Sequence, residues 1–152
     1  MSFVWCDYNP QTMRYVEAWL DPEAISSTGL DQGFRAFFEY WANEAGYDPG
    51  ENFWCKVISE NDDPLAVLAF CQDKDRLIIM EFIVSPEKRG QSIGARLLKD
   101  LLENKGIIDS SFSRCEAVIY PSNIASQKAF ENAGFHYLRT HEDGGSMLYT
   151  HP

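Results

Sequence analysis

A two-glycine loop between an apolar run and a leucine-rich stretch most constrains how this chain can fold. The segment SPEKRGQSIGARLL, residues 85–98, directly follows the apolar run LIIMEFIV. Strand, short loop and helix in that order leave the amide groups of the helix's first turn without intrahelical partners. Such a helix N-terminus binds anions, phosphates in particular. The segment therefore predicts a strand–loop–helix unit with an anion site.

Composition places the chain among folded, single-domain proteins. Its 152 residues are 45% hydrophobic and 24% charged, which suffices for one domain with its own core. No apolar run approaches bilayer length, and the N-terminal MSFVWCDYNP lacks the pattern of a signal peptide. We therefore expect one cytoplasmic domain over residues 1–152 with no membrane partner.

The cysteines and histidines indicate neither a disulfide frame nor a metal site. No C-x-x-C pair occurs, and the histidines lack ligand spacing with a cysteine or acidic partner. We expect reduced thiols and no bound metal. The residues concerned are Cys6, Cys55, Cys71, Cys115, His136, His141 and His151.

Net charge is −10, which argues against nonspecific binding of nucleic acid. The charge is uneven, because residues 1–63 hold 12 acids and 3 bases whereas residues 64–152 hold 11 acids and 10 bases. Lys88 and Arg89 lie beside the start of the expected helix, where a solvated surface and an anion partner both remain open.

Periodicity and turn signals predict a mixed α/β order, β-α-α-β-β-β-α-β-α-β-β. Such an order favours a mixed sheet with helices packed on it. The run at 76–84 is apolar on both faces and is expected at the centre of the sheet. The segment 21–33 is expected to be a loop, and Gly106 to end the third helix. The expected strands are 2–8, 52–59, 64–72, 76–84, 114–120, 135–141 and 146–152, with turns at 60–64 and 142–145, and the expected helices are 10–20, 34–46, 92–106 and 121–135.

Two motifs at this spacing resemble the GNAT (Gcn5-related N-acetyltransferase) superfamily. One is its acyl-CoA loop, [RQ]-x-x-G-x-[GA], at residues 89–94, and the other is its Asn-x-x-[AS]…[YF]…Gly-Phe helix, at residues 123–135. The resemblance implies an acyl-CoA N-acyltransferase fold, with a central, mostly antiparallel mixed sheet and helices on both faces. Residues 1–50 would form a helical acceptor-site portion, and residues 53–150 an acyl-CoA-binding core.

The resemblance also implies acetyl-CoA as co-substrate. Its pyrophosphate would lie on the loop, and its pantetheine arm would pair with the backbone near Ile83 and Val84. Asn123 fits either a contact to that arm or the N-cap of its helix. The expected cofactor-binding residues are Ile83, Val84, Lys88, Arg89, Gly90, Gln91, Ser92, Ile93, Gly94, Ala95, Asn123, Ser126 and Phe130.

Ser92 departs from the family pattern, which has glycine there. A serine still supplies the backbone N–H, and its hydroxyl adds a donor. Because helical residues follow, we expect a negative φ at Ser92, at which serine costs little.

Acyl transfer to an amine needs a base, an oxyanion donor and an acid for the leaving thiolate. Glu81 is the lone acid in LIIMEFIV and is the expected base, the alternative being a rim carboxylate facing water. The resemblance places the oxyanion donor at the backbone of Val84. Phe130 stands where many members have a tyrosine and cannot donate a proton, so Tyr120 is the first candidate acid, with a purely structural aromatic as its alternative. Glu116, at a strand start, is expected to be solvated.

The family places its acceptor site between the first helices and the splayed strands. We expect Phe34, Phe38 and Trp41 to line it, and the acid surplus of residues 1–63 favours a cationic amine. The expected function is N-acetyl transfer from acetyl-CoA to a primary amine of a small molecule. A protein amine as acceptor, a non-catalytic acyl-CoA-binding or regulatory module and a plain nucleotide-binding domain remain alternatives. The oligomeric state, monomer or homodimer, stays open.

Overall fold

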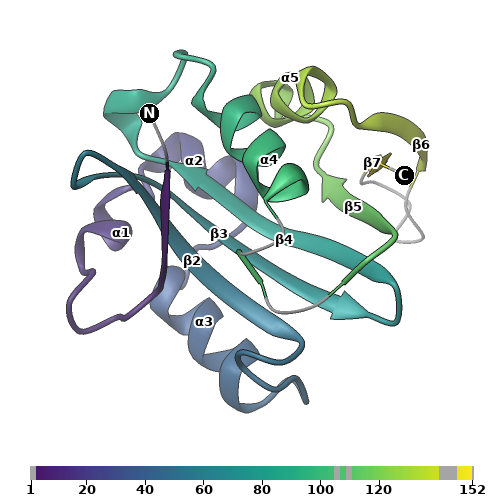
Figure 1. Cartoon of the computed structure of the whole chain (residues 1–152). Coiled ribbons are helices and arrows are strands. Elements are labelled where there is room, and N and C mark those ends of the chain that lie inside the picture. Colours follow the sequence, from purple (N-terminus) through teal and green to yellow (C-terminus); the bar gives the residue numbers. More distant parts are fainter. Residues whose placement is uncertain (1–2, 105–106, 109–110, 141–146, 152) are drawn as a thin grey trace.

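A seven-stranded sheet forms the framework of the computed structural model, which describes residues 3–104, 107–108, 111–140 and 147–151 (Figure 1). Its strands are β1 (Val4–Asp7), β2 (Phe53–Glu60), β3 (Asp63–Asp73), β4 (Arg76–Val84), β5 (Arg114–Ile119), β6 (His136–Thr140) and β7 (Met147–His151). The helices are α1 (Tyr15–Ala18), α2 (Pro22–Thr28), α3 (Phe34–Asn43), α4 (Ile93–Glu103) and α5 (Ile124–Asn132), with a 3-10 turn η1 (Pro86–Lys88) before α4.

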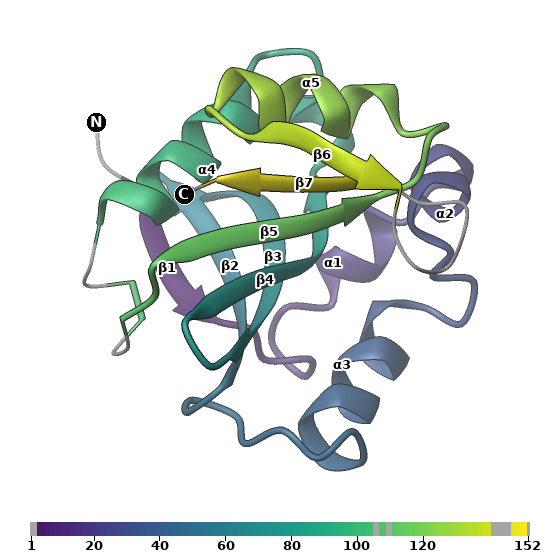
Figure 2. The ribbon, with the colours of Figure 1, turned by 90° about the vertical axis from the view of Figure 1, so that its right-hand side faces the viewer.

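The sheet is mixed and mostly antiparallel, as the resemblance implied. Its strand order is β1-β2-β3-β4-β5-β7-β6, so β4 is central, as its apolar sequence predicts. All neighbours are antiparallel except β4 and β5, which run parallel and are joined through α4. Figure 2 shows β5, β7 and β6 side by side at one end of the sheet.

Helices cover both faces of the sheet and enclose two hydrophobic layers (Figure 1). On one face, α4 and α5 bury apolar side chains such as Leu97 and Phe130 against the sheet. On the other face, α1 and α3 contribute Val16 and Phe34 to a second layer. From Ala66 to Cys71, strand β3 supplies both layers by alternation, with Leu68 in the first and Val67 in the second.

The turn between β2 and β3 is the hairpin that its sequence predicts. Asn61 and Asp62 both have positive φ, +54° and +64°. Two-residue hairpin loops favour such angles, and Asn and Asp tolerate them better than most residues.

The N-terminal helices differ from expectation. The helix expected over 10–20 is reduced to α1, because the Asn9 side chain accepts hydrogen bonds from the amides of Gln11 and Thr12 and holds a turn there. The expectation of a loop over 21–33 is wrong, because this segment contains α2. Asp21 caps that helix through the Ala24 amide at 2.9 Å, and Gly29 ends it at φ +76°.

A long-range contact starts α3. The Glu17 carboxylate accepts hydrogen bonds from the amides of Phe34 and Arg35 at 3.0 and 2.9 Å. A Cβ at Gly33 would lie 2.9 Å from this carboxylate, so the approach requires glycine. One side chain thereby fixes α3 relative to α1.

The structure describes all four cysteines. All four cysteines are free thiols, three of them buried and Cys6 exposed. None of the described helices is long and apolar enough to cross a membrane. The expected helix stop at Gly106, the turn at 142–145 and His141 lie outside the described residues.

Candidate functional site

Strands β4 and β5 separate beyond their first four paired positions. Their register runs from Arg76 opposite Arg114 to Ile79 opposite Ala117. Past these residues β4 continues to Val84 without β5 as a partner. The gap opens at the end of the parallel pair, where α2 and α5 also approach the sheet (Figure 1).

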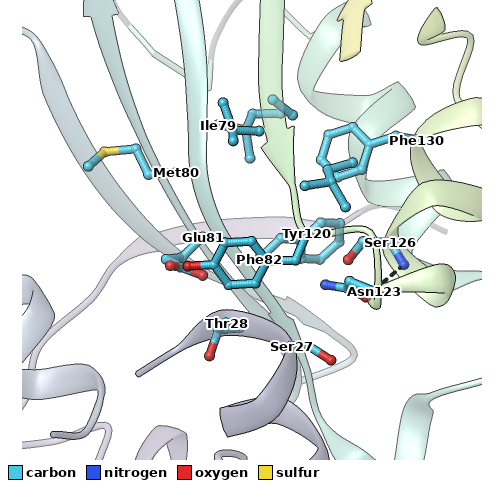
Figure 3. A pocket seen from close by; sticks show the side chains of 13 residues that line it. Ser27, Thr28, Ile79, Met80, Glu81, Phe82, Tyr120, Asn123, Ser126 and Phe130 are labelled. Atoms are coloured by element: carbon cyan, nitrogen blue, oxygen red, sulfur yellow. Dashed lines mark hydrogen bonds between the residues drawn. The ribbon is translucent and has the colours of Figure 1, made fainter. Parts of the chain in front are cut away.

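Two adjoining cavities occupy this region. The Glu81 cavity, about 230 Å³, is lined by residues of β4, β5, α2 and α5 (Figure 3). The loop cavity, about 450 Å³, follows β4 to the loop before α4. The two share Ser27, Thr28, Phe82, Asn123 and Ser126, so they adjoin each other at the end of α2.

A β-bulge directs Glu81 into the first cavity. Ala69 of β3 lies opposite Glu81 and Phe70 opposite Ile79, so Met80 is an extra residue in β4. Strict alternation would put Glu81 on the same face as Ile79, in the α4–α5 layer. The bulge reverses the pattern, and Phe82 packs in that layer while Ile83 packs on the opposite face.

Burial changes the acidity of Glu81. Desolvation raises the pKa of its carboxyl to about 8, because a charged carboxylate is poorly solvated in this cavity. Glu81 is therefore a carboxyl group that gains or loses its proton close to neutral pH, which suits a general base.

Tyr120 and Phe130 border the same cavity in different ways. Tyr120 is 43% exposed, and in Figure 3 its hydroxyl points to the side of the cavity where Glu81 lies. Phe130 is buried, with its ring edge-on to Phe82 and Phe135. The ring at position 130 thus belongs to the core, and Tyr120 supplies a hydroxyl at the cavity wall.

The loop before α4 adopts a conformation that the sequence does not predict. Ser92 is the N-cap of α4 with φ +60°, so the expected negative φ is wrong. Its side chain makes no capping hydrogen bond. The left-handed conformation explains the family's preference for glycine here.

Gly94 allows α4 and α5 to approach closely. A Cβ at Gly94 would lie 3.1 Å from the Cβ of Ala129 and 3.6 Å from the Phe82 ring. The amides of α4's first turn, residues 93–95, have no intrahelical acceptor and lie at the loop cavity. The free amides at the N-terminus of α4 are therefore suited to binding an anion.

The two cationic side chains of the loop are paired with carboxylates. Lys88 Nζ lies 2.9 Å from Asp63 Oδ2, and Arg89 Nη1 lies 2.7 Å from Asp21 Oδ2. Gln91 points back to the carbonyl of Glu87. Lys88 and Arg89 nevertheless border the loop cavity, as do Gly90, Ser92, Ile93, Gly94 and Ala95 of the loop and Ile83 and Val84 of β4.

Asn123 combines both roles considered for it. Its Oδ1 accepts a hydrogen bond from the Ser126 amide at 3.1 Å and caps α5. Both residues also line both cavities, and in Figure 3 the Asn123 amide nitrogen points away from the capping bond. The cap leaves the NH₂ group for a ligand.

Several side chains lie elsewhere than expected. Phe34 is fully buried in the α1–α3 layer, Phe38 and Trp41 pack against that layer, and none of the three lines either cavity. Glu116 is buried and paired with Arg76 at 2.8 Å and Arg114 at 3.6 Å, so the expectation that it is solvated is wrong.

Sequence reasoning missed the contributions of α2 and α5. Ser27 and Thr28 line both cavities but fall in the segment expected to be a loop. Lys128 and Asn132 line the loop cavity from one face of α5, and their i, i+4 spacing was the available signal. Among the described residues, no group of three or more His, Cys, Asp or Glu side chains is placed to hold a metal ion.

Replacing Ser92 with glycine should stabilise the protein by up to about 1 kcal/mol, because glycine adopts a positive φ without the Cβ penalty. Urea unfolding measures this change. Ser111→Gly is the matched control, because Ser111 has no positive φ and glycine there only adds freedom to the unfolded chain. If Ser92→Gly lowered the free energy of unfolding as much as Ser111→Gly does, the positive φ of Ser92 would not be a source of strain.

Glu81 should make stability fall with rising pH. Its pKa is about 8 when folded against a model value of 4.5, so between these pH values the unfolded chain has released a proton that the native state keeps. The unfolded state then binds fewer protons, and the free energy of unfolding decreases through this window. Glu81→Gln removes the effect, so the variant should gain in urea midpoint over the wild type from pH 4.5 to about 8. If the difference in urea midpoint between Glu81→Gln and the wild type did not change with pH, the raised pKa of Glu81 would be refuted.

Comparison with known proteins agrees with this architecture. The model of the acetyltransferase (GNAT) family matches residues 8–135. No curated protein sequence matches significantly. The structure is similar to that of the aminoglycoside acetyltransferase AAC(6')-Ib in complex with coenzyme A, with a TM-score of 0.76, 15% identity and coverage of 99% of this chain and 94% of that one. It is also similar to an acetyltransferase from Thermus thermophilus, with a TM-score of 0.75, 13% identity and coverage of 100% and 97%. Identities this low show a shared fold alone, but the family model spans most of the sequence, and the chain therefore belongs to the acetyltransferase (GNAT) family.

Proposed function

We propose that this protein transfers an acetyl group from acetyl-CoA to the primary amine of a small, cationic acceptor. The observation that carries the proposal is the position of Glu81, a carboxyl with a raised pKa in the wall of the smaller of two adjoining cavities. One cavity leads to the N-terminus of α4 and the other opens between β4 and β5. A base next to such an anion site suits acyl transfer from a phosphate-bearing thioester.

In this proposal the loop cavity holds acetyl-CoA. The amides of residues 93–95 face its pyrophosphate, and the NH₂ of Asn123 contacts its pantetheine arm. The arm extends along β4 past Ile79, where β5 no longer pairs. AAC(6')-Ib, which has been solved with coenzyme A and with kanamycin, supports a site of this kind on the same fold.

The chain's own groups then have distinct tasks. Glu81 accepts the proton of the attacking amine as the new C–N bond forms and the C–S bond breaks. The Ser85 amide donates to the Leu65 carbonyl of β3, so alternation turns the Val84 amide to the opposite side, toward the gap. That amide can stabilise the negative charge that develops on the carbonyl oxygen. Tyr120 or a water molecule protonates the departing thiolate.

The acceptor is proposed from size and charge. A volume of about 230 Å³ admits a small amine or the end of a larger one. The 12 acids of residues 1–63 against 3 bases favour the approach of a cation. A flexible protein tail with a basic residue would satisfy the same conditions and is distinguished by the acceptor panel below.

Calorimetric titration with acetyl-CoA, CoA and ATP, followed by thiol release with a panel of amines, tests the function. We expect acetyl-CoA to bind and cationic small amines to be acetylated faster than neutral or acidic ones. Binding without turnover on any amine or basic peptide would support a non-catalytic acyl-CoA-binding module, which the core position of Phe130 favours. A preference for ATP would overturn the proposal.

Glu81→Gln should lower kcat by about two to four orders of magnitude, the usual contribution of a general base. The acetyl-CoA affinity should stay nearly unchanged, because Glu81 lines only the Glu81 cavity of the two. In the wild type, kcat/KM should rise with pH toward a plateau above about 8, as Glu81 loses its proton. Glu103→Gln on the exposed end of α4 is the control and should leave both constants unchanged. An unaltered pH profile in Glu81→Gln would remove Glu81 from the mechanism.

A further inference from the structure

We infer that Arg89 is a positioning residue that braces α2 against the cofactor loop, and that it does not bind the phosphates of the co-substrate. The inference rests on the proposed function for its consequence in catalysis. It concerns the first residue of the loop motif, whose position beside α4 suggested an anion partner. Arg89 borders the loop cavity, but its side-chain hydrogen bonds all go to protein groups, in β4 and in the segment between α1 and α2.

All three guanidinium nitrogens of Arg89 have acceptors. Nε donates to the carbonyl of Val84 at 3.1 Å, Nη1 to Asp21 Oδ2 at 2.7 Å, and Nη2 to the carbonyl of Trp19 at 3.0 Å. A second carboxylate, of Glu23, lies 3.8 Å from Nη1. The fork therefore joins the end of β4 to the segment between α1 and α2.

The carboxylate of Asp21 accepts hydrogen bonds from two different donors. Its Oδ1 accepts from the Ala24 amide and caps α2, whereas its Oδ2 binds Arg89. These bonds lower the pKa of Asp21, chiefly through the Ala24 amide and further through Arg89, so its carboxylate stays charged. One side chain thus fixes both the start of α2 and its link to the loop.

The far end of α2 forms the wall that both cavities share. Ser27 and Thr28 line the Glu81 cavity and the loop cavity. Because α2 is only seven residues long, a displacement at Asp21 reaches Ser27 within two turns. The brace therefore sets the position of the acceptor wall relative to the loop that holds the co-substrate.

Charge accounting argues against a phosphate contact for this arginine. Two carboxylates already neutralise its guanidinium, and a phosphate would have to displace Asp21 from a 2.7 Å bond. The loop cavity also has Lys128 in its wall, and no ion pair of Lys128 occurs among the described residues. The amides of α4 and Lys128 can meet an anion without breaking the brace.

Two substitutions separate the brace from an anion ligand. Asp21→Asn keeps an oxygen for the Ala24 amide but removes the charge that holds Arg89. Arg89→Lys keeps the positive charge but cannot reach three acceptors with one ammonium group. If Arg89 is a brace, both variants raise KM for the amine by about tenfold, because a displaced wall misplaces the acceptor. Neither variant should bind acetyl-CoA more tightly than the wild type, and both should keep its salt dependence, since no phosphate contact is gained or lost.

An anion ligand predicts the opposite pattern. Asp21→Asn would then free Arg89 and tighten acetyl-CoA binding, and Arg89→Lys would retain most of the affinity with no effect on the amine. Either result overturns the inference. The double variant tests whether the two residues act together. If they form one brace, the amine KM of the double variant is no higher than that of the more impaired single variant. If they act independently, the two increases in KM multiply.

Controls keep this outcome apart from a failure of the proposed function. Arg35→Gln breaks the exposed Arg35–Glu39 pair on α3. This variant should leave the amine KM and the acetyl-CoA Kd unchanged. If the wild type neither binds acetyl-CoA nor acetylates any amine, the proposed function fails. The brace is then judged by a double-mutant cycle on urea unfolding, where additive effects of Asp21→Asn and Arg89→Lys would refute it.

Discussion

The limited pairing of β4 with β5 is the constraint on which the functional region depends. Two parallel strands that stayed paired would fill the space now occupied by the cavities, and no backbone amide of β4 would face a ligand. The bulge at Met80 adds to this effect, because it turns Glu81 away from the layer under α4 and α5. The end of the β4–β5 pairing at Ile79 and the bulge at Met80 are adjacent, so the opening and the acid that lines it arise within a few residues of each other.

The carboxylates in this protein lie in two kinds of surroundings, and Glu81 differs from the others. Glu116 is buried but paired with two arginines, Asp21 holds Arg89, and Glu17 caps α3 through two amides. Each of these carboxylates has ion-pair or hydrogen-bond partners in the protein. The pKa of Glu81 is instead raised by desolvation alone. A carboxyl without compensation is costly to keep in a fold, which favours a chemical role over a structural one.

Local patterns predicted much of the architecture because they act over short distances. The hairpin at Asn61–Asp62, the central position of β4 and the leucine face of α4 follow from turn chemistry and periodicity. The loop motif likewise led to the cavity at the start of α4. Prediction failed for α2, whose signals were an Asp-Pro start and a glycine end without an apolar stripe. The φ of Ser92 was also wrong, because the turn into α4 reverses the backbone one residue before the helix begins.

The sequence by itself determined the family, the order of the strands and of the helices other than α2, and the glycine loop before α4, since each is written in neighbouring residues. Only the tertiary structure decided what the charged and aromatic side chains do. Arg89 meets a carboxylate 68 positions away, Glu116 meets Arg76 across 40 positions, and Phe34 is enclosed by the layer it helps to build. Such partners are chosen by packing of distant segments, and a pattern of neighbouring residues holds no record of them.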